Sequence, residues 1–300
     1  MTSSKVRTIV VMDTMVSIRT VGRDDPDAVE RAFDWFHRIE AACSRFDRGS
    51  EVQRLASCAG EPVGVSDILF ATAQFALALA EETDGAFDPT VGRRMEQLGF
   101  DREYRTGERV TSFVGDDGPV SFRDVHADDN SRTLMLDKPV VLDLGAVAKG
   151  FAIDMAAREL QSIESFAIDA GGDLFLAGRN EDDAPWTVAI RDPRDANATI
   201  AVLEASNAAV CTSGDYLRRN DHGEHHIIDP RTGAPTREII SATVTAPLAM
   251  VADGLGTAAF VLGAERGIAL LERHGVEGLL VTSTLEHHRT RGAQQVLSNT

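Results

Sequence analysis

Cysteine is scarce in this chain of 300 residues, which has only Cys43, Cys58 and Cys211. The number is odd and no two are spaced as CxxC, so the sequence excludes a disulfide framework and a structural zinc site. Free thiols fit a reducing compartment. No apolar run reaches the roughly 18 residues that a membrane span needs. The apolar N-terminal stretch is too short for a signal peptide and is broken by Asp13. We therefore expect a cytoplasmic protein with no membrane anchor.

Basic residues are also few, because 30 Lys and Arg face 47 Asp and Glu and leave a net charge of −17. Such a field repels the phosphates of nucleic acids and anionic lipid surfaces, so we expect no nucleic-acid partner. A small anionic ligand remains compatible, because a bound divalent cation or a group of backbone amides can reverse the sign locally. The sequence also lacks GxSxG, HExxH and any recognisable Cys/His spacing, so hydrolases that use these motifs and zinc enzymes find no support.

The composition that remains is that of a folded globular chain. Hydrophobic residues make up 43% and charged residues 26%, which excludes intrinsic disorder. The length is about twice that of a usual domain. Neither a Pro/Ser-rich linker nor a repeat divides the chain, so we expect one domain over residues 1–300, with a polar tail from about residue 284.

Hydrophobic periodicity predicts a mixture of helices and strands. Residues 6–20 predict a strand or hairpin, and residues 99–129 predict loops with one or two edge strands. Helices are expected from residue 26, from a cap at Ser66 to the turn at residues 84–85, and over 147–160, 248–262 and 264–274. Strands are expected over residues 140–144, 165–168, 174–176, 186–190, 200–204, 208–211, 239–245 and 278–282.

Two glycine patterns resemble nucleotide-binding motifs. Gly254 and Gly256 imitate a dinucleotide fingerprint, but they lie inside a helical pattern with no suitable acid downstream. The segment Gly145–Gly150 lacks the spacing and the Ser/Thr of a P-loop. Its glycine turn, helix start and Lys149 favour either a phosphate cradle or tight strand–helix packing, and both interpretations stay open.

Asp253 and Thr257 lie four residues apart in a helical pattern and hence on one face. Both offer the hard oxygen ligands that magnesium accepts. The alternative is a solvent-facing acid and a threonine bonded to its own helix. Because the surrounding face carries small apolar residues such as Ala249, Ala252 and Ala258, an acid there needs a partner, which favours the metal.

His226 stands with His225 at the head of a short predicted strand that ends in the turn Asp229-Pro230. Neighbouring strand residues point to opposite sides, so at most one of these histidines faces a given site. Histidine can move protons near neutral pH, although a lone histidine is more often structural or exposed. Two turn segments, residues 83–90 and 212–216, are not specific alone; the amides of the second suit an anion.

Eight segments occur in an order that resembles the ApbE-type FAD:protein FMN transferases. The Lys-Gly pair at 149–150, His-Ile-Ile-Asp-Pro at 226–230 and the Asp-x-x-x-Thr pattern at 253–257 are the most discriminating. The segments are residues 12–14, 44–51, 84–89, 142–150, 169–172, 212–216, 226–230 and 253–257. They span most of the chain.

The resemblance implies an α+β fold with largely antiparallel or mixed sheets flanked by helices. It also implies magnesium-dependent cleavage of FAD and transfer of FMN, through a phosphoester bond, to a threonine or serine of a partner flavoprotein. AMP is released. The implied catalytic residues are His226, Lys149 and Asp253, and the implied magnesium ligands are Asp253, Thr257 and the carbonyl of Ala146. The implied FAD contacts are Met12, Phe46, Ala86, Phe87, Asp88, Asp143, Lys149 and Ile227.

The sequence departs from the family pattern at two positions. Ala56 stands where the family commonly has asparagine, and Asp13 stands where glycine is usual. A missing hydrogen bond at residue 56 leaves the balance between transfer and hydrolysis open. The alternatives are therefore a magnesium-dependent FAD pyrophosphatase that yields FMN and AMP, and a non-catalytic FAD-binding protein.

Overall fold

The computed structural model describes residues 3–102, 107–112 and 118–293. The chain forms two compact units, each discontinuous in sequence. Unit 1 comprises residues 1–36, 149–217 and 236–300, and unit 2 comprises residues 37–148 and 218–235. Two of the four boundaries between them fall within helices, α1 (Pro26–Cys43) and α5 (Gly145–Glu159). A single domain over residues 1–300 stays a prediction, and each unit is described by itself.

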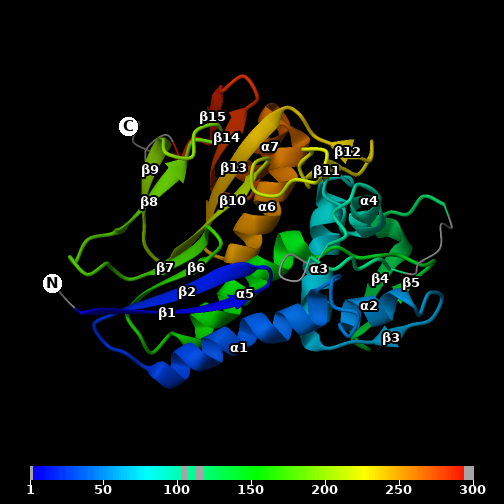
Figure 1. Ribbon diagram of the computed structural model, residues 1–300, viewed down its shortest axis with the longest axis horizontal. Coiled ribbons are helices and arrows are strands. Elements are labelled where there is room, and N and C mark those ends of the chain that lie inside the picture. Colours follow the sequence, from blue (N-terminus) through cyan, green and yellow to red (C-terminus); the bar gives the residue numbers. More distant parts are fainter. Residues whose placement is uncertain (1–2, 103–106, 113–117, 294–300) are drawn as a thin grey trace. The chain divides into compact units, whose positions relative to one another are not determined.

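Unit 1 is built on an eight-stranded sheet in the order β1-β2-β6-β7-β10-β13-β14-β15 (Figure 1). Each neighbouring pair is antiparallel. The strands are β1 (Ser4–Val11), β2 (Thr14–Val21), β6 (Ser165–Ala170), β7 (Asp173–Ala177), β10 (Ala208–Gly214), β13 (Ile239–Ala246), β14 (Glu277–Thr282) and β15 (His287–Arg289). Together with its helices, this sheet confirms the α+β class.

Tight turns with left-handed backbone connect the strands. Met12 and Asp13 form the two-residue turn between β1 and β2, with φ of 52° and 58°. Two successive left-handed residues give the hairpin turn whose twist matches the strands. Gly171 and Gly172, with φ of 67° and 97°, make the predicted glycine turn between β6 and β7. The predicted hairpin and glycine turn are confirmed.

The two faces of the sheet have different covers (Figure 1). Helices α6 (Ala249–Leu262) and α7 (Ala264–Arg273) pack on one face, where the Cys211 thiol points to the Ala249 carbonyl. A ribbon of β8 (Trp186–Arg191) and β9 (Thr199–Ala205) packs on the other. Its core joins Trp186 and Leu203 to sheet residues Val210 and Val281. Because side chains alternate along a strand, these residues divide the sheet between two cores.

Unit 2 combines short helices with a small sheet in the order β3-β5-β4. Ser66 caps α3 through the Leu69 amide, and Asp84 and Gly85 end it in left-handed conformations, as predicted. Helix α2 and helix α4 were not predicted. The elements are α2 (Glu51–Ala56), α3 (Asp67–Glu82), α4 (Gly92–Gln97), β3 (Val63–Gly64), β4 (Val125–Asp128), β5 (Thr133–Leu136), β11 (Ile228–Asp229), β12 (Ala234–Pro235) and the 3-10 helices η1 (Pro89–Val91) and η2 (Phe122–Asp124).

The strand predicted over residues 140–144 is wrong. The segment is buried, but it forms no strand and pairs with η1 and the start of α4 instead. The Asp143 amide donates to the Pro89 carbonyl at 2.7 Å, and the Gly92 amide donates to the Val141 carbonyl at 3.2 Å. A Cβ on Gly92 would lie 2.5 Å from that carbonyl. An apolar β-branched run is therefore buried here by a loop contact that requires glycine, and not by a sheet.

Within the polar tail expected from about residue 284, residues 287–289 form an edge strand, β15, that was not predicted. The strand is short and polar, so it lacks the apolar alternation that a sequence pattern can detect. The other predicted helices and strands are confirmed to within a few residues. In the described residues no helix has the length and apolarity to cross a membrane.

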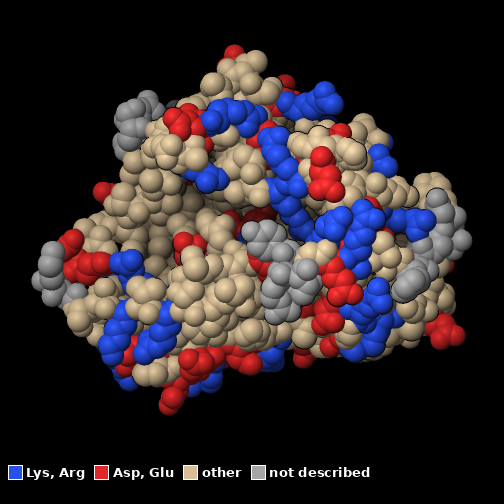
Figure 2. All heavy atoms as spheres, viewed as in Figure 1, with Lys and Arg blue, Asp and Glu red and all other residues tan. Residues whose placement is uncertain are grey.

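Acidic and basic side chains are interspersed on the molecular face shown in Figure 2. The net charge of −17 is therefore not gathered there into one acidic patch. The charge balance of each local cluster, rather than the total, decides which ligand it suits.

Candidate active site

In unit 1 two buried carboxylates share one ammonium group. Lys149, in α5, forms an ion pair with Asp173 at the start of β7, and its Nζ lies 3.5 Å from Oδ2 of Asp253 in α6. Asp173 is 4% exposed and Asp253 7%. We call Lys149, Asp173, Asp253, Thr257 and Ser213 the acidic cluster. The cluster thus has two carboxylates for one ammonium group.

Asp253 carries most of this imbalance. Its Oδ2 is buried and accepts no hydrogen bond from any residue that the structure describes. Burial raises the pKa of this carboxyl, while the charge of Lys149 and the Gly150 amide act in the opposite direction without cancelling the effect. One turn further along α6, the Thr257 hydroxyl lies 3.3 Å from the Ser213 hydroxyl. A poorly compensated carboxylate beside hydroxyl oxygens is a donor set that fits a hard divalent cation.

No group of three or more His, Cys, Asp or Glu residues suited to a metal occurs in the described ranges. A cation at the acidic cluster would therefore rely on hydroxyl, carbonyl or water oxygens besides Asp253, which suits magnesium better than zinc.

Asp173 is the member of the acidic cluster that sequence reasoning missed. Its Oδ1 accepts the Thr212 amide at 3.0 Å, and its other oxygen faces Lys149. The residue thus connects the Lys-Gly segment of α5 to Thr212, which lies in β10 and not in the turn predicted over residues 212–216. A signal was present in the sequence, because an acid directly follows the glycine turn at residues 171–172.

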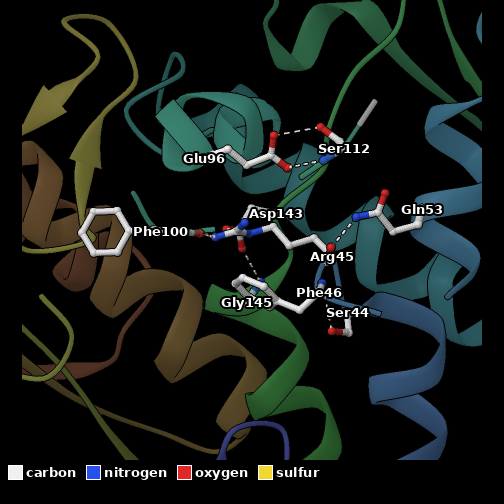
Figure 3. Close-up of polar contacts among 9 residues, drawn as sticks. All are labelled: Ser44, Arg45, Phe46, Gln53, Glu96, Phe100, Ser112, Asp143 and Gly145. Atoms are coloured by element: carbon white, nitrogen blue, oxygen red, sulfur yellow. Dashed lines mark hydrogen bonds and ion pairs between the residues drawn. The ribbon is translucent and has the colours of Figure 1, made fainter. Parts of the chain in front are cut away.

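In unit 2 a second polar cluster is built around a buried arginine. Arg45 follows α1, and its side chain is only 3% exposed. As Figure 3 shows, it reaches Asp143, where Nε donates to Oδ2 at 2.7 Å, and the Phe100 carbonyl, which accepts from Nη2 at 2.6 Å. Gln53 donates to the Arg45 carbonyl and the Gly145 amide donates to Asp143. These bonds fix a guanidinium that is almost wholly removed from solvent.

A second guanidinium belongs to the same cluster. Arg45 lies over the Phe46 ring at 4.1 Å from its centroid and Arg218 at 5.1 Å. Burial acts to raise the pKa of Asp143, but the charges of Arg45 and Arg218 and the Gly145 amide hold it below its usual value. We call Arg45, Phe46, Asp143, Arg218 and His226 the arginine cluster. In this cluster the charges of two guanidiniums hold one carboxylate in its ionised form.

His226 lies in a bend just before β11, and its ring packs edge-on against Phe100 at 6.4 Å between centroids. It was expected at the head of a strand, and β11 begins two residues later, at Ile228. Burial and the charge of Arg218 lower the pKa of His226 to about 4. Its Nδ1 is buried and has no hydrogen-bond partner among the described residues. The imidazole is therefore neutral near pH 7 and keeps a free nitrogen.

The remaining predicted site residues lie in turns and loops. Both carboxylate oxygens of Asp88 already accept hydrogen bonds from nearby residues. Oδ1 accepts from the amide and hydroxyl of Thr90, and Oδ2 accepts from the Phe122 amide. Ala86 and Phe87 are buried beside it. Any ligand contact by residues 86–88 would thus depend on the shape and backbone of this turn.

For the three remaining residues of the predicted site, the structure gives the position in the chain fold. Met12 lies in the β1–β2 turn of unit 1. Ala146 lies in the first turn of α5, within unit 2. Ile227 is buried, and its amide donates to Nδ1 of His225 at 3.3 Å. The structure thus brings Lys149, Asp253 and Thr257 together in unit 1, and Phe46, Asp143 and His226 in unit 2. Their roles remain predictions.

The ApbE family model matches residues 12–280 of this chain. The chain belongs to the ApbE family. A protein named FAD:protein FMN transferase from Vibrio cholerae is 34% identical over 255 residues, covering 80% of this chain and 75% of that protein. One of the same name from Treponema pallidum is 34% identical over 284 residues, covering 85% and 76%.

Solved ApbE structures have the same fold. The ApbE protein of Thermotoga maritima matches with a TM-score of 0.86 and 31% identity, covering 98% of this chain and 99% of that one. The flavin transferase ApbE from Vibrio cholerae also matches with a TM-score of 0.86, at 28% identity, covering 99% and 100%.

The two departures from the ApbE pattern have different structural contexts. Asp13 has φ of 58°, a left-handed conformation that glycine adopts without strain and that aspartate tolerates better than most residues. Its presence in place of glycine is thus compatible with the turn. Ala56 is the buried last residue of α2, where a methyl group takes the place of an amide that could hydrogen-bond.

Proposed function

We propose that this ApbE chain transfers FMN from FAD to a threonine or serine hydroxyl of an acceptor flavoprotein, with magnesium, and releases AMP. The observation that carries the proposal is the buried, undercompensated carboxylate of Asp253 beside Lys149, at the position where the family resemblance implies a metal ligand. Relatives named FAD:protein FMN transferase, similar over most of the chain, support it.

Asp253 and Thr257 would hold the magnesium ion, together with the Ala146 carbonyl that the resemblance implies. When bound, the ion neutralises charge on the pyrophosphate of FAD. Lys149 supplies a second positive charge. Because Lys149 is shared between Asp173 and Asp253, a cation that binds Asp253 frees part of the ammonium's attraction for a substrate phosphate.

His226 would accept the proton of the attacking hydroxyl. The oxygen–phosphorus bond to the acceptor forms while the phosphorus–oxygen bond to AMP breaks, and AMP departs with its phosphate. A neutral imidazole can take the proton, and an anionic phosphate next to it would raise its low pKa toward the useful range.

The arginine cluster would bind FAD through charge and stacking. The Phe46 ring, which both guanidiniums approach, offers an aromatic surface, and guanidinium groups are donors that recognise phosphates. The other proposed FAD contacts are Met12, Ala86, Phe87, Asp88, Lys149 and Ile227. A cytoplasmic location, and hence a cytoplasmic acceptor, stays part of the proposal.

The second candidate is a magnesium-dependent FAD pyrophosphatase, which the buried alanine at position 56 favours. Transfer requires that the acceptor hydroxyl be held in line and that water be excluded, and a missing polar contact weakens such positioning.

One assay separates the candidates. The protein is incubated with FAD and magnesium, with and without an acceptor domain, while AMP, free FMN and acceptor mass are followed. We expect slow AMP release alone, fast AMP release with acceptor, and an acceptor that gains FMN only when its target threonine is intact. Rapid AMP and FMN release that the acceptor does not change would support the pyrophosphatase. FAD that stays intact would support a binding protein.

A further inference from the structure

Asp154 is a buried acid of α5 that makes contact with the beginning of another helix. Its Oδ1 accepts the Ala249 amide at 2.7 Å and its Oδ2 accepts the Met250 amide at 3.0 Å. These are the first two residues of α6, and the residue before them, Leu248, provides no side-chain cap. The first amides of a helix have no partner within the helix. A carboxylate from α5 therefore caps α6 with both of its oxygens.

The same face of α5 touches α6 one turn earlier. A Cβ on Gly150 would lie 2.5 Å from the Ala249 carbonyl and 2.6 Å from the Met250 Cα, so the two backbones meet where only glycine fits. Gly150 and Asp154 are four residues apart and share one helix face. Lys149 immediately precedes this contact. Two turns of α5 thus fix the start of α6 and also present the ammonium that meets Asp253.

The position of Asp253 follows from this contact. It lies four residues after Ala249, about one turn into α6, and Thr257 follows one turn later. Because an α-helix moves nearly as a rigid rod, a shift of its first turn along or about the axis carries both side chains with it. The 3.5 Å separation between Lys149 and Asp253 depends on the same register.

We propose that Asp154 is a positioning residue that sets the register of α6 against α5 and thereby the metal-binding geometry of Asp253 and Thr257. The inference rests on the proposed function, which assigns the cation to these two residues. The alternative is a cap that contributes stability alone. The residue is 7% exposed, and burial raises its pKa to about 6 while the two amides act in the opposite direction. Near pH 7 the cap is therefore mostly ionised, as the positive end of a helix favours.

The test compares two carboxylates of unit 1 that each cap the start of a helix, the buried Asp154 and the exposed Glu238. Asp154→Asn keeps the shape of the side chain but replaces one carboxylate oxygen by an NH₂ group, which cannot accept a hydrogen bond from an α6 amide. The matched control is Glu238→Gln, because Glu238 Oε1 caps the Ala264 amide at the start of α7 at 2.8 Å. Helix α7 carries none of the proposed site residues. Each variant is titrated with magnesium chloride alone while its melting temperature is followed, and the transfer rate is measured against magnesium concentration.

A positioning role predicts that Asp154→Asn needs about 10- to 100-fold more magnesium for half of the thermal shift and for half of the maximal rate. Its rate at saturating magnesium should stay within about threefold of the unchanged chain, since the ligands themselves remain. Glu238→Gln should melt at a lower temperature but keep the magnesium dependence of the unchanged chain. Asp154→Glu, which keeps the charge with a longer side chain, should shift the magnesium requirement in the same direction by a smaller factor.

Suppose that the original sequence responds to magnesium and that both Asp154→Asn and Asp154→Glu need the same magnesium concentration as it does. This result would overturn the positioning role of Asp154 but not the proposed function. An equal shift in Glu238→Gln would overturn the positioning role as well, because capping in general would then be the cause. If Asp154→Asn fails to fold, Asp154→Glu decides. An unchanged chain that neither responds to magnesium nor transfers FMN would overturn the proposed function, and the inference with it.

Discussion

The acidic cluster of unit 1 contains a buried aspartate beside a cation and the arginine cluster of unit 2 a partly buried one, yet the pKa values of these two aspartates move in opposite directions. Burial acts to raise both. In the acidic cluster one lysine serves two carboxylates, and the pKa of Asp253 stays raised. In the arginine cluster two guanidiniums serve one carboxylate, and the pKa of Asp143 is lowered. The neighbouring charges, and not burial, thus decide the direction in which each pKa moves.

The largest effect is expected at the acidic cluster. Asp253→Asn should lower the transfer rate by at least about 10³-fold, because a neutral amide coordinates magnesium weakly. Without magnesium the variant should melt at the same temperature as the unchanged chain or higher, since it removes the undercompensated charge. Rates and melting curves check both results, with Asp128→Asn, an exposed carboxylate of β4, as control. Full activity of Asp253→Asn at the magnesium concentration that serves the original sequence would contradict this account of the acidic cluster. Strong destabilisation of the variant without magnesium would contradict it as well.

His226→Ala sharpens the account of the arginine cluster. We expect a rate loss of about 10²- to 10⁴-fold with FAD affinity nearly kept, because a proton acceptor is removed and a binding charge is not. The exposed His222 of the same segment provides the control variant His222→Ala. The measurement is single-turnover transfer together with FAD binding. A loss confined to binding, with the saturated rate unchanged, would make His226 a binding residue instead.

Arg45→Met should produce the largest loss of stability. It leaves the partly buried Asp143 with one cation fewer and removes the donor of the Phe100 carbonyl, so the free energy of unfolding should fall by about 3 kcal/mol. Urea unfolding measures it. Adding Asp143→Asn to Arg45→Met should recover part of this loss, because the orphaned charge then disappears. Strictly additive losses in the double variant would show that the two side chains do not act as a pair.

A smaller effect is expected from pH. The pKa of His226 falls from 6.5 to about 4 on folding, so between these values the unfolded chain binds the proton more readily than the folded one. Stability from this group is therefore present above pH 6.5 and is lost as the pH falls toward 4. Relative to His226→Ala, the unchanged chain should lose roughly 1 kcal/mol between pH 7 and pH 5. Thermal unfolding at the two values measures it, and parallel curves for both proteins would contradict the low pKa.

What could be predicted from the sequence was local. The spacing of Asp253 and Thr257, the cap at Ser66 and the turn at Gly171 and Gly172 each lie within a few residues of one another. Periodicity also located most helices and strands. These features need no knowledge of the rest of the chain.

The features that were missed join distant parts of the chain. Arg45 meets Asp143 across 98 residues and Asp154 meets Ala249 across 95. Asp173 acquires its role only when Lys149 and Thr212 come beside it. No periodic pattern marks such partners. The error at residues 140–144 has the same origin, because an apolar run shows that a segment is buried but not whether a strand or a loop buries it.

Calorimetric titration of magnesium into the unchanged chain, Asp253→Asn and Asp143→Asn tests the comparison most directly. If the acidic cluster is the cation site and the arginine cluster the anion site, Asp253→Asn should lose the binding heat while Asp143→Asn keeps it. Magnesium binding that survives Asp253→Asn, or that disappears only in Asp143→Asn, would contradict the account.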